Sequence, residues 1–247
     1  MKTIHHPADS RGNANHGWLK SKHSFSFANY YDPERMGFGV LRVINDDFVI
    51  GGQGFGRHSH RDMEIISIPL SGKLAHADSM GNKGVIKTGD IQVMSAGTGI
   101  THSEMNDSQE EAVRFLQIWI LPKEKSVAPR YQQTAMQGLM QPNRFAQVLS
   151  PKVDHQNIDD QNVNNQGVWI HQDAWFSIGQ FETGVTERYQ LNNPDNGVYV
   201  FVIEGNVTIA GNILSTRDGL GIWDTEDFSM DVEERATVLL MEVPFYE

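Results

Sequence analysis

Short segments of β-strand length, separated by turn residues, constrain the fold of this chain more than any other feature. The segments are rich in Val, Ile, Phe and Trp, and Gly, Pro, Asn or Asp residues bound them. No stretch shows the sustained 3.6-residue periodicity of a long helix. We therefore predict an all-β protein with little helix, folded as sandwiches or barrels. The predicted strands are 38–44, 64–70, 90–94, 114–121, 169–176, 199–203, 207–209 and 238–243.

The order of strands and turns is similar in the two halves of the chain. A segment that begins at Ile68 and another that begins at Val202 both run strand, small-residue turn, strand, turn and strand. We predict two tandem β-barrels, 1–132 and 133–247, with the boundary after a Pro-Arg-Tyr turn. The polar stretch 154–166 is expected to form a solvated loop inside the second barrel.

The composition disfavours several classes of protein. The formal net charge is −11, and no basic stripe is visible, so direct nucleic-acid binding is not expected. No apolar run reaches the ~18 residues that a membrane helix needs. The N-terminal segment lacks the apolar core of a secretory signal. Cysteine is absent, which excludes disulfides and thiolate metal sites and fits a cytoplasmic protein.

Two pairs of potential metal ligands lie beside predicted strands. His58 and His60 follow one glycine-rich stretch, and His102 and Glu104 follow another. Side chains at i and i+2 of a strand point to the same face, so two such pairs on neighbouring strands can converge inside a barrel. Either pair alone is a weak signal. Together they predict a site for one divalent transition metal, with room for water or substrate as in catalytic sites.

The spacing of these residues resembles the double motif of the cupin family. The first motif, G-x5-H-x-H-x3-E-x6-G, is matched by Gly52, His58, His60 and Glu64. Its closing glycine stands one place late, at Gly72.

The second cupin motif, G-x5-P-x-G-x2-H-x3-N, is matched with two departures. Gly89, Gly97, His102 and Asn106 fit it, while Ser95 stands where the proline is expected. The gap between Gly97 and His102 is two residues longer than in the general motif. This longer gap resembles the spacing found in one branch of the cupins.

That branch is the pirin family, which the chain resembles over nearly its whole length. The resemblance is greatest to bacterial pirin-like proteins credited with quercetin 2,3-dioxygenase activity. It implies two tandem cupin barrels of the jelly-roll type, of which the second is a degenerate copy without metal. The stretches that carry the resemblance are 12–18, 23–27, 30–33, 41–45, 94–97, 102–104 and 117–122.

The carboxylate ligand is ambiguous in the sequence. Many cupins use the glutamate of the first motif, here Glu64, and strand alternation places Glu64 on the same face as His58 and His60. The pirin resemblance implies Glu104 as the fourth ligand beside the three histidines. Glu64 would then orient a histidine, and either carboxylate could accept a proton during catalysis.

The resemblance implies a metal-dependent dioxygenase that opens flavonols such as quercetin with O2 and releases carbon monoxide. Iron(II) is the metal it implies, although Mn, Ni, Cu, Zn or Co would also suit these ligands. The expected partners are a small aromatic substrate and O2, and the chain is expected to be a monomer. The alternative is a metal- or redox-sensing module that regulates partner proteins without turnover.

Other histidines and aromatic residues receive weaker predictions. His5, His6 and His16 lie in a polar segment and are expected to be solvated. His23 and His76 have no potential ligand partner nearby in sequence, and His155 and His171 form no His-x-His pair, so no second metal site is predicted. Four phenylalanines could line an aromatic pocket or belong to the core: Phe25, Phe27, Phe38 and Phe55.

Overall fold

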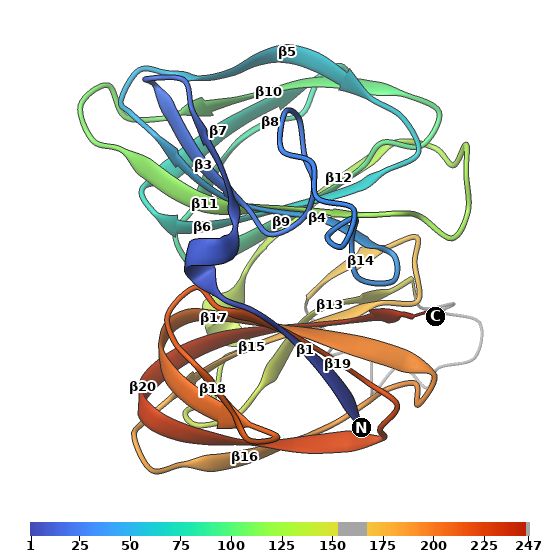
Figure 1. The fold of residues 1–247 in the computed structure, drawn as a ribbon. Helices are drawn as coiled ribbons and strands as arrows, with labels where there is room; N and C mark the ends of the chain where they lie inside the picture. Colours follow the sequence, from blue (N-terminus) through green and yellow to red (C-terminus); the bar gives the residue numbers. More distant parts are fainter. Residues whose placement is uncertain (153–166, 246–247) are drawn as a thin grey trace.

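A computed structural model describes residues 1–152 and 167–245 of the chain. The predicted loop 154–166 lies outside the described residues. The fold is all-β, with 61% strand and 3% helix, which confirms the predicted class. Figure 1 shows two β-barrels stacked on one another, the N-terminal barrel above and the C-terminal barrel below. The two helical segments are single 3-10 turns, η1 (Ala8–Ser10) and η2 (Met136–Gly138).

Two sheets enclose the N-terminal barrel. One has four strands in the order β5 (Gly54–His60), β10 (Ile100–Asn106), β7 (Lys73–Asp78) and β8 (Lys83–Lys87). The other has seven strands and faces the C-terminal barrel. Its strands, in order across the sheet, are β12 (Arg130–Ala135), β9 (Asp90–Ser95), β6 (Glu64–Ser71), β11 (Val113–Ile120), β4 (Leu41–Val49), β3 (Leu19–His23) and β2 (Gly12–Asn15).

A nine-stranded sheet curls to form the C-terminal barrel. Its two long strands, β17 (Asn196–Ile209) and β20 (Asp227–Pro244), pair along most of their length, and bulges in this pairing let them bend into both layers. Strand β16 (Thr186–Gln190) pairs with β20, and β18 (Asn212–Leu214) pairs with β17. The remaining strands are β1 (Lys2–His6), β19 (Gly219–Trp223), β15 (Trp175–Phe181), β13 (Ala146–Pro151) and β14 (Val168–Ile170).

The division between the two barrels differs from the division of the sequence into two halves, both at the start of the chain and near Gln132. The expected division at Gln132 falls inside β12, which pairs with β9 of the N-terminal barrel as far as Ala135. Strand β1 begins the chain but pairs with β19 in the C-terminal sheet. The chain therefore crosses between the barrels both after β1 and after β12.

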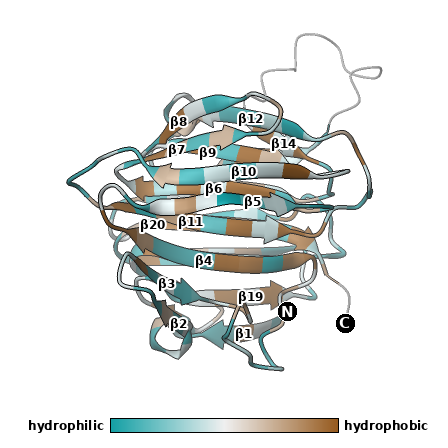
Figure 2. Ribbon diagram, turned by 90° about the horizontal axis from the view of Figure 1, so that it is seen from above, coloured by the Kyte–Doolittle hydropathy of each residue, from teal (hydrophilic) through white to brown (hydrophobic). Residues whose placement is uncertain are grey.

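The largest hydrophobic core lies between the barrels. It joins the outward face of the seven-stranded sheet, including Ile66 and Ile118, to residues of the C-terminal sheet such as Val148 and Met241. Polar and apolar segments alternate along the strands (Figure 2), as expected where only one face of a strand is apolar. The interior of the C-terminal barrel holds a continuous apolar cluster.

The interior of the N-terminal barrel is divided. Small apolar clusters around Phe115 and around Ile65 lie apart, and polar side chains occupy the layer between the two sheets. This polar layer contains the predicted histidines. Within the described residues, the structure has no helix with the length and hydrophobicity of a membrane span.

Candidate metal centre

Three of the predicted ligands converge between the two sheets of the N-terminal barrel. His58 and His60 lie on β5 and His102 on β10, and the register of these antiparallel strands places His102 opposite His58. The ring centroids of His102 lie 4.4 Å from those of His58 and 5.0 Å from those of His60. One ring nitrogen from each of the three lies within 4.8 Å of the others. Strand alternation thus brings both predicted positions of β5 to one point, as expected.

The protonation and hydrogen bonding of these imidazoles favour binding of a metal ion. His102 Nε2 is buried and has no hydrogen-bond partner among the described residues, which leaves its lone pair available. Burial and the neighbouring His58 lower the pKa of His60 to about 4, and burial with three neighbouring histidines lowers the pKa of His102 to about 2. Both rings are therefore neutral near pH 7, the form that binds metal ions. The three side chains fit a divalent transition metal.

Glu104 lies in the same pocket but outside the three-histidine group. Its side chain is buried on the same inward face of β10 as His102, and a bulge in β5 shifts the strand pairing between these two residues. Its carboxylate accepts hydrogen bonds at 3.0 Å from Ser67 Oγ and at 2.8 Å from Gln117 Nε2. Burial raises the pKa of Glu104 above its usual value. Two donors therefore hold this carboxylate beside the histidines.

Glu64 lies elsewhere, contrary to the alternation argument. It begins β6, which belongs to a different sheet from β5, and the intervening Asp62 has a left-handed backbone with φ of 48°. Continuous strand parity is lost across this turn. The buried Glu64 accepts a 2.6 Å hydrogen bond from Ser95 Oγ, and burial raises its pKa to about 7. Glu64 is absent from both the histidine group and the residues that line the pocket in the described chain.

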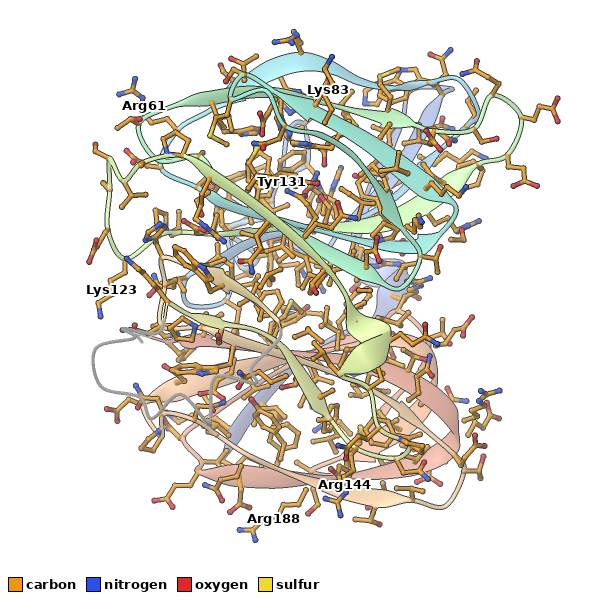
Figure 3. All side chains as sticks on the ribbon, turned by 180° about the vertical axis from the view of Figure 1, so that it is seen from behind. Arg61, Lys83, Lys123, Tyr131, Arg144 and Arg188 are labelled. Carbon is orange, nitrogen blue, oxygen red and sulfur yellow. The ribbon has the colours of Figure 1, made fainter. Side chains whose placement is uncertain are left out.

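His76 contacts the centre although its sequence neighbours did not point to it. It lies on β7, where Leu74, His76 and Asp78 alternate inward, and its Nε2 is 3.3 Å from His102 Nδ1. The ring stacks on Tyr131 at 4.9 Å between centroids, and Figure 3 shows Tyr131 inside the N-terminal barrel. The alternating pattern of β7 was the available signal, because it points His76 into the barrel.

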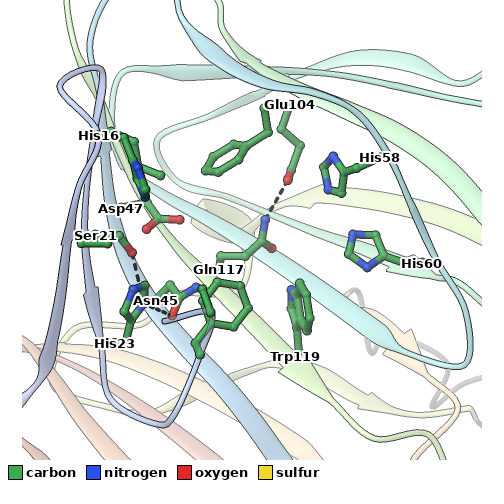
Figure 4. Close-up of a pocket in the computed structure, with 15 residues that line it drawn as sticks. His16, Ser21, His23, Asn45, Asp47, His58, His60, Glu104, Gln117 and Trp119 are labelled. Carbon is green, nitrogen blue, oxygen red and sulfur yellow. Dashed lines mark hydrogen bonds between the residues drawn. The ribbon is translucent and has the colours of Figure 1, made fainter. Parts of the chain in front are cut away.

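His58, His60 and Glu104 border a pocket with aromatic walls (Figure 4), and the ring of His102 lies against those of His58 and His60. Its cavity volume is about 230 Å³, just below the range usual for small-molecule sites, and the cavity opens to solvent. Phe27, Phe55 and Trp119 supply flat apolar surface, and the ring of Trp119 packs edge-on against His60 at 5.0 Å. Of the four phenylalanines considered, Phe25 and Phe38 instead belong to the core between the barrels.

The N-terminal histidines differ from one another. His5 and His16 are exposed, and His16 reaches the pocket lining. The expectation that His6 is solvated was wrong. Its side chain is buried, and its Nδ1 lies 3.0 Å from the hydroxyl of Tyr199, because β1 crosses to the C-terminal sheet.

Comparison with known proteins places the chain in a family. Residues 5–120 match the Pirin family model, and residues 160–243 match a model described as the quercetinase C-terminal cupin domain. A protein of Escherichia coli K12 named quercetin 2,3-dioxygenase is 45% identical over 240 residues, which cover 96% of each chain. A pirin-like protein of Caulobacter vibrioides is 39% identical over 96% of this chain and 97% of its own.

Solved structures agree with these sequence matches. The crystal structure of YhhW from Escherichia coli has a TM-score of 0.90 and 42% identity, covering 100% of this chain and 99% of its own. A second structure, of the bacterial pirin YhhW in complex with nickel(II), has a TM-score of 0.89 and 42% identity, covering 99% of this chain and 100% of its own. The chain belongs to the pirin family.

Proposed function

We propose that this chain is a metal-dependent dioxygenase that opens flavonols such as quercetin with O2 and releases carbon monoxide. The observation that carries the proposal is the convergence of nitrogens from His58, His60 and His102 at the wall of an aromatic pocket. The name of the Escherichia coli relative, quercetin 2,3-dioxygenase, supports the same reaction. A small aromatic substrate and O2 are the proposed partners.

We propose one metal per chain, with His58, His60, His102 and Glu104 as its ligands. When bound, a divalent transition metal would supply Lewis-acid stabilisation of the deprotonated flavonol hydroxyl. Iron(II) is our first choice, as the pirin resemblance implies. The relative solved with nickel(II) supports nickel as the second choice.

The side chains of the pocket would bind and orient the substrate. Phe27, Phe55 and Trp119 offer flat surfaces for the flavonol rings, and the barrel walls would limit the access of bulk water. The carboxylate of Glu104 would accept the proton of the 3-hydroxyl group, because it lies at the pocket wall beside His58 and His60. Ser67 and Gln117 would keep the carboxylate in position through their hydrogen bonds.

Metal analysis combined with an assay of O2 uptake and CO release tests the proposal. We expect protein purified without chelator to contain about one metal per chain and to consume O2 with quercetin. His58→Ala should bind the metal at least ~10- to 100-fold more weakly and lose turnover, while keeping the circular dichroism of the parent chain. His5→Ala removes an exposed histidine outside the pocket and serves as the matched control.

Two outcomes would contradict the proposal. The first is turnover of quercetin by metal-depleted His58→Ala. The second is tight binding of a protein partner by the metal-loaded chain with no consumption of O2, which would favour the regulatory alternative. We further propose a monomeric chain in the cytoplasm, and light scattering after size-exclusion chromatography tests the oligomeric state.

A further inference from the structure

Asp47 is a buried carboxylate that faces the pocket from the side opposite the histidines. It lies on β4, and the strand register places it between Ser21 of β3 and Phe115 of β11. Its side chain lines the pocket and the residue is only 3% exposed. In Figure 4, Asp47 lies across the pocket from His58 and His60.

One carboxylate oxygen of Asp47 is unsatisfied. Oδ1 is buried and has no hydrogen-bond partner in the described part of the chain. Two neighbouring polar side chains do have partners, since His23 Nδ1 lies 2.7 Å from Asn45 Oδ1 and Gln117 donates to Glu104. Among the described residues of the pocket lining, Trp119 Nε1 also lacks a partner, but it is a donor rather than an acceptor. Leaving such a group unpaired is unfavourable, so an unpaired acceptor at a pocket wall indicates a missing ligand donor.

The charges around Asp47 agree with this interpretation. Burial raises its pKa to about 7, the hydrogen bond from Ser21 opposes this, and the nearby carboxylates of Glu104 and Asp46 raise it further. No cation is among these influences on the pKa of Asp47. A neutral hydroxyl donor would therefore satisfy Oδ1 without requiring a counter-ion.

We propose that Asp47 selects hydroxylated substrates by accepting, at Oδ1, a hydrogen bond from a substrate hydroxyl remote from the three histidines. The inference rests on the proposed function, because that function places the reacting oxygen of the flavonol at His58, His60 and His102. The substrate class is then a flat aromatic molecule with hydroxyls at both ends. An analogue that lacks the remote hydroxyls would leave Asp47 unpaired and would bind more weakly.

The experiment compares quercetin with 3-hydroxyflavone, which keeps the reacting hydroxyl but lacks all the others. Equilibrium dissociation constants are measured by fluorescence for the metal-free and the metal-loaded protein. Asp47→Leu removes both acceptor oxygens at similar size, and Asp47→Asn keeps one oxygen acceptor without charge. The exposed Glu110→Gln is the control for loss of a carboxylate.

We expect the wild-type protein to prefer quercetin over 3-hydroxyflavone. Asp47→Leu should reduce this preference by roughly 10- to 100-fold, the size expected for one hydrogen bond to a buried carboxylate. Asp47→Asn should reduce it less, and Glu110→Gln should leave it unchanged. Should Asp47→Leu fail to fold, as judged by thermal unfolding, the Asn variant decides the result.

An unchanged preference in the Asp47 variants, or no preference in the wild-type protein, would overturn the inference. Turnover of quercetin with an unchanged preference would overturn the role of Asp47 and leave the proposed function standing. A preference in binding that depends on Asp47, found without any consumption of O2, would support the role of Asp47 and overturn the proposed function. The two results are separable because the binding measurement in metal-free protein is independent of catalysis.

Discussion

At the scale of residues, the two ring nitrogens of His102 have different surroundings. Nε2 is buried without a partner among the residues described, while Nδ1 lies 3.3 Å from His76 Nε2. If Nε2 binds a metal, Nδ1 of His102 must carry the proton. It then donates a hydrogen bond to Nε2 of His76. His76, held by its stacking on Tyr131, would therefore fix the tautomer and orientation of His102.

Replacing His76 tests this positioning role. His76→Phe keeps a ring that can stack on Tyr131 but removes the acceptor for His102. We expect metal affinity to fall by about 10- to 100-fold, as is usual for loss of a partner behind a ligating histidine. Titration against a competing chelator measures this change. His76→Gln, which keeps an oxygen acceptor, should recover part of the affinity, and equal losses in both variants would contradict the acceptor role.

At the scale of elements, the two barrels use their strands differently. The strands of the N-terminal barrel leave a polar pocket between sheets, whereas β17 and β20 fill the C-terminal barrel with apolar side chains. Near the end of β20, the fully buried Glu242 accepts hydrogen bonds from Tyr189, Asn192, Asn193 and Asn196. This carboxylate ties the connection between β16 and β17 to the barrel.

Substitution of Glu242 tests the importance of that connection. Glu242→Gln replaces one acceptor oxygen with a donor, so at least two backbone or side-chain donors would face an NH2 group. We expect the free energy of unfolding in urea to fall by roughly 2–4 kcal/mol. Glu233→Gln, an exposed position on the same strand, should change it by less than ~0.5 kcal/mol. Similar small effects in both variants would show that the network contributes little.

At the scale of the whole molecule, β1 joins the N-terminus to the C-terminal barrel. His6, at the end of β1, is buried against Phe25 and Tyr199 in the region between the barrels. Burial lowers the pKa of His6 from 6.5 to about 4, with the charges of Arg35 and His5 acting in the same direction. The junction of the two barrels therefore contains a group that resists protonation.

This junction predicts an acid-dependent loss of stability. Between pH 6.5 and about 4 the unfolded chain binds a proton at His6 that the folded chain does not, so folding stability decreases as the pH falls through this range. The resulting loss of folding stability from His6 is about 3 kcal/mol by pH 4. Denaturant unfolding across this range should show a shallower decline in His6→Gln than in the wild-type protein. His5→Gln is the matched control, and parallel profiles for wild type and His6→Gln would contradict the assignment.

The sequence alone determined the features that depend on local periodicity. Alternation within short segments predicted the all-β class, and the i, i+2 spacing placed His58 and His60 on one face of β5. Both follow from the alternation of side chains along a strand, which can be read from a short segment of sequence. The motif around His102 predicted the third histidine because it resembles the pirin pattern.

Only the tertiary structure decided the features that depend on which strands become neighbours. The turn at Asp62 moved Glu64 into another sheet, where strand parity from β5 no longer applies. His76 reaches His102 across 26 residues of sequence, and Asp47 is buried at the pocket wall by packing between sheets. Such contacts arise from the closure of the barrel, which minimises the exposed apolar surface of the whole chain and is not encoded in any one segment.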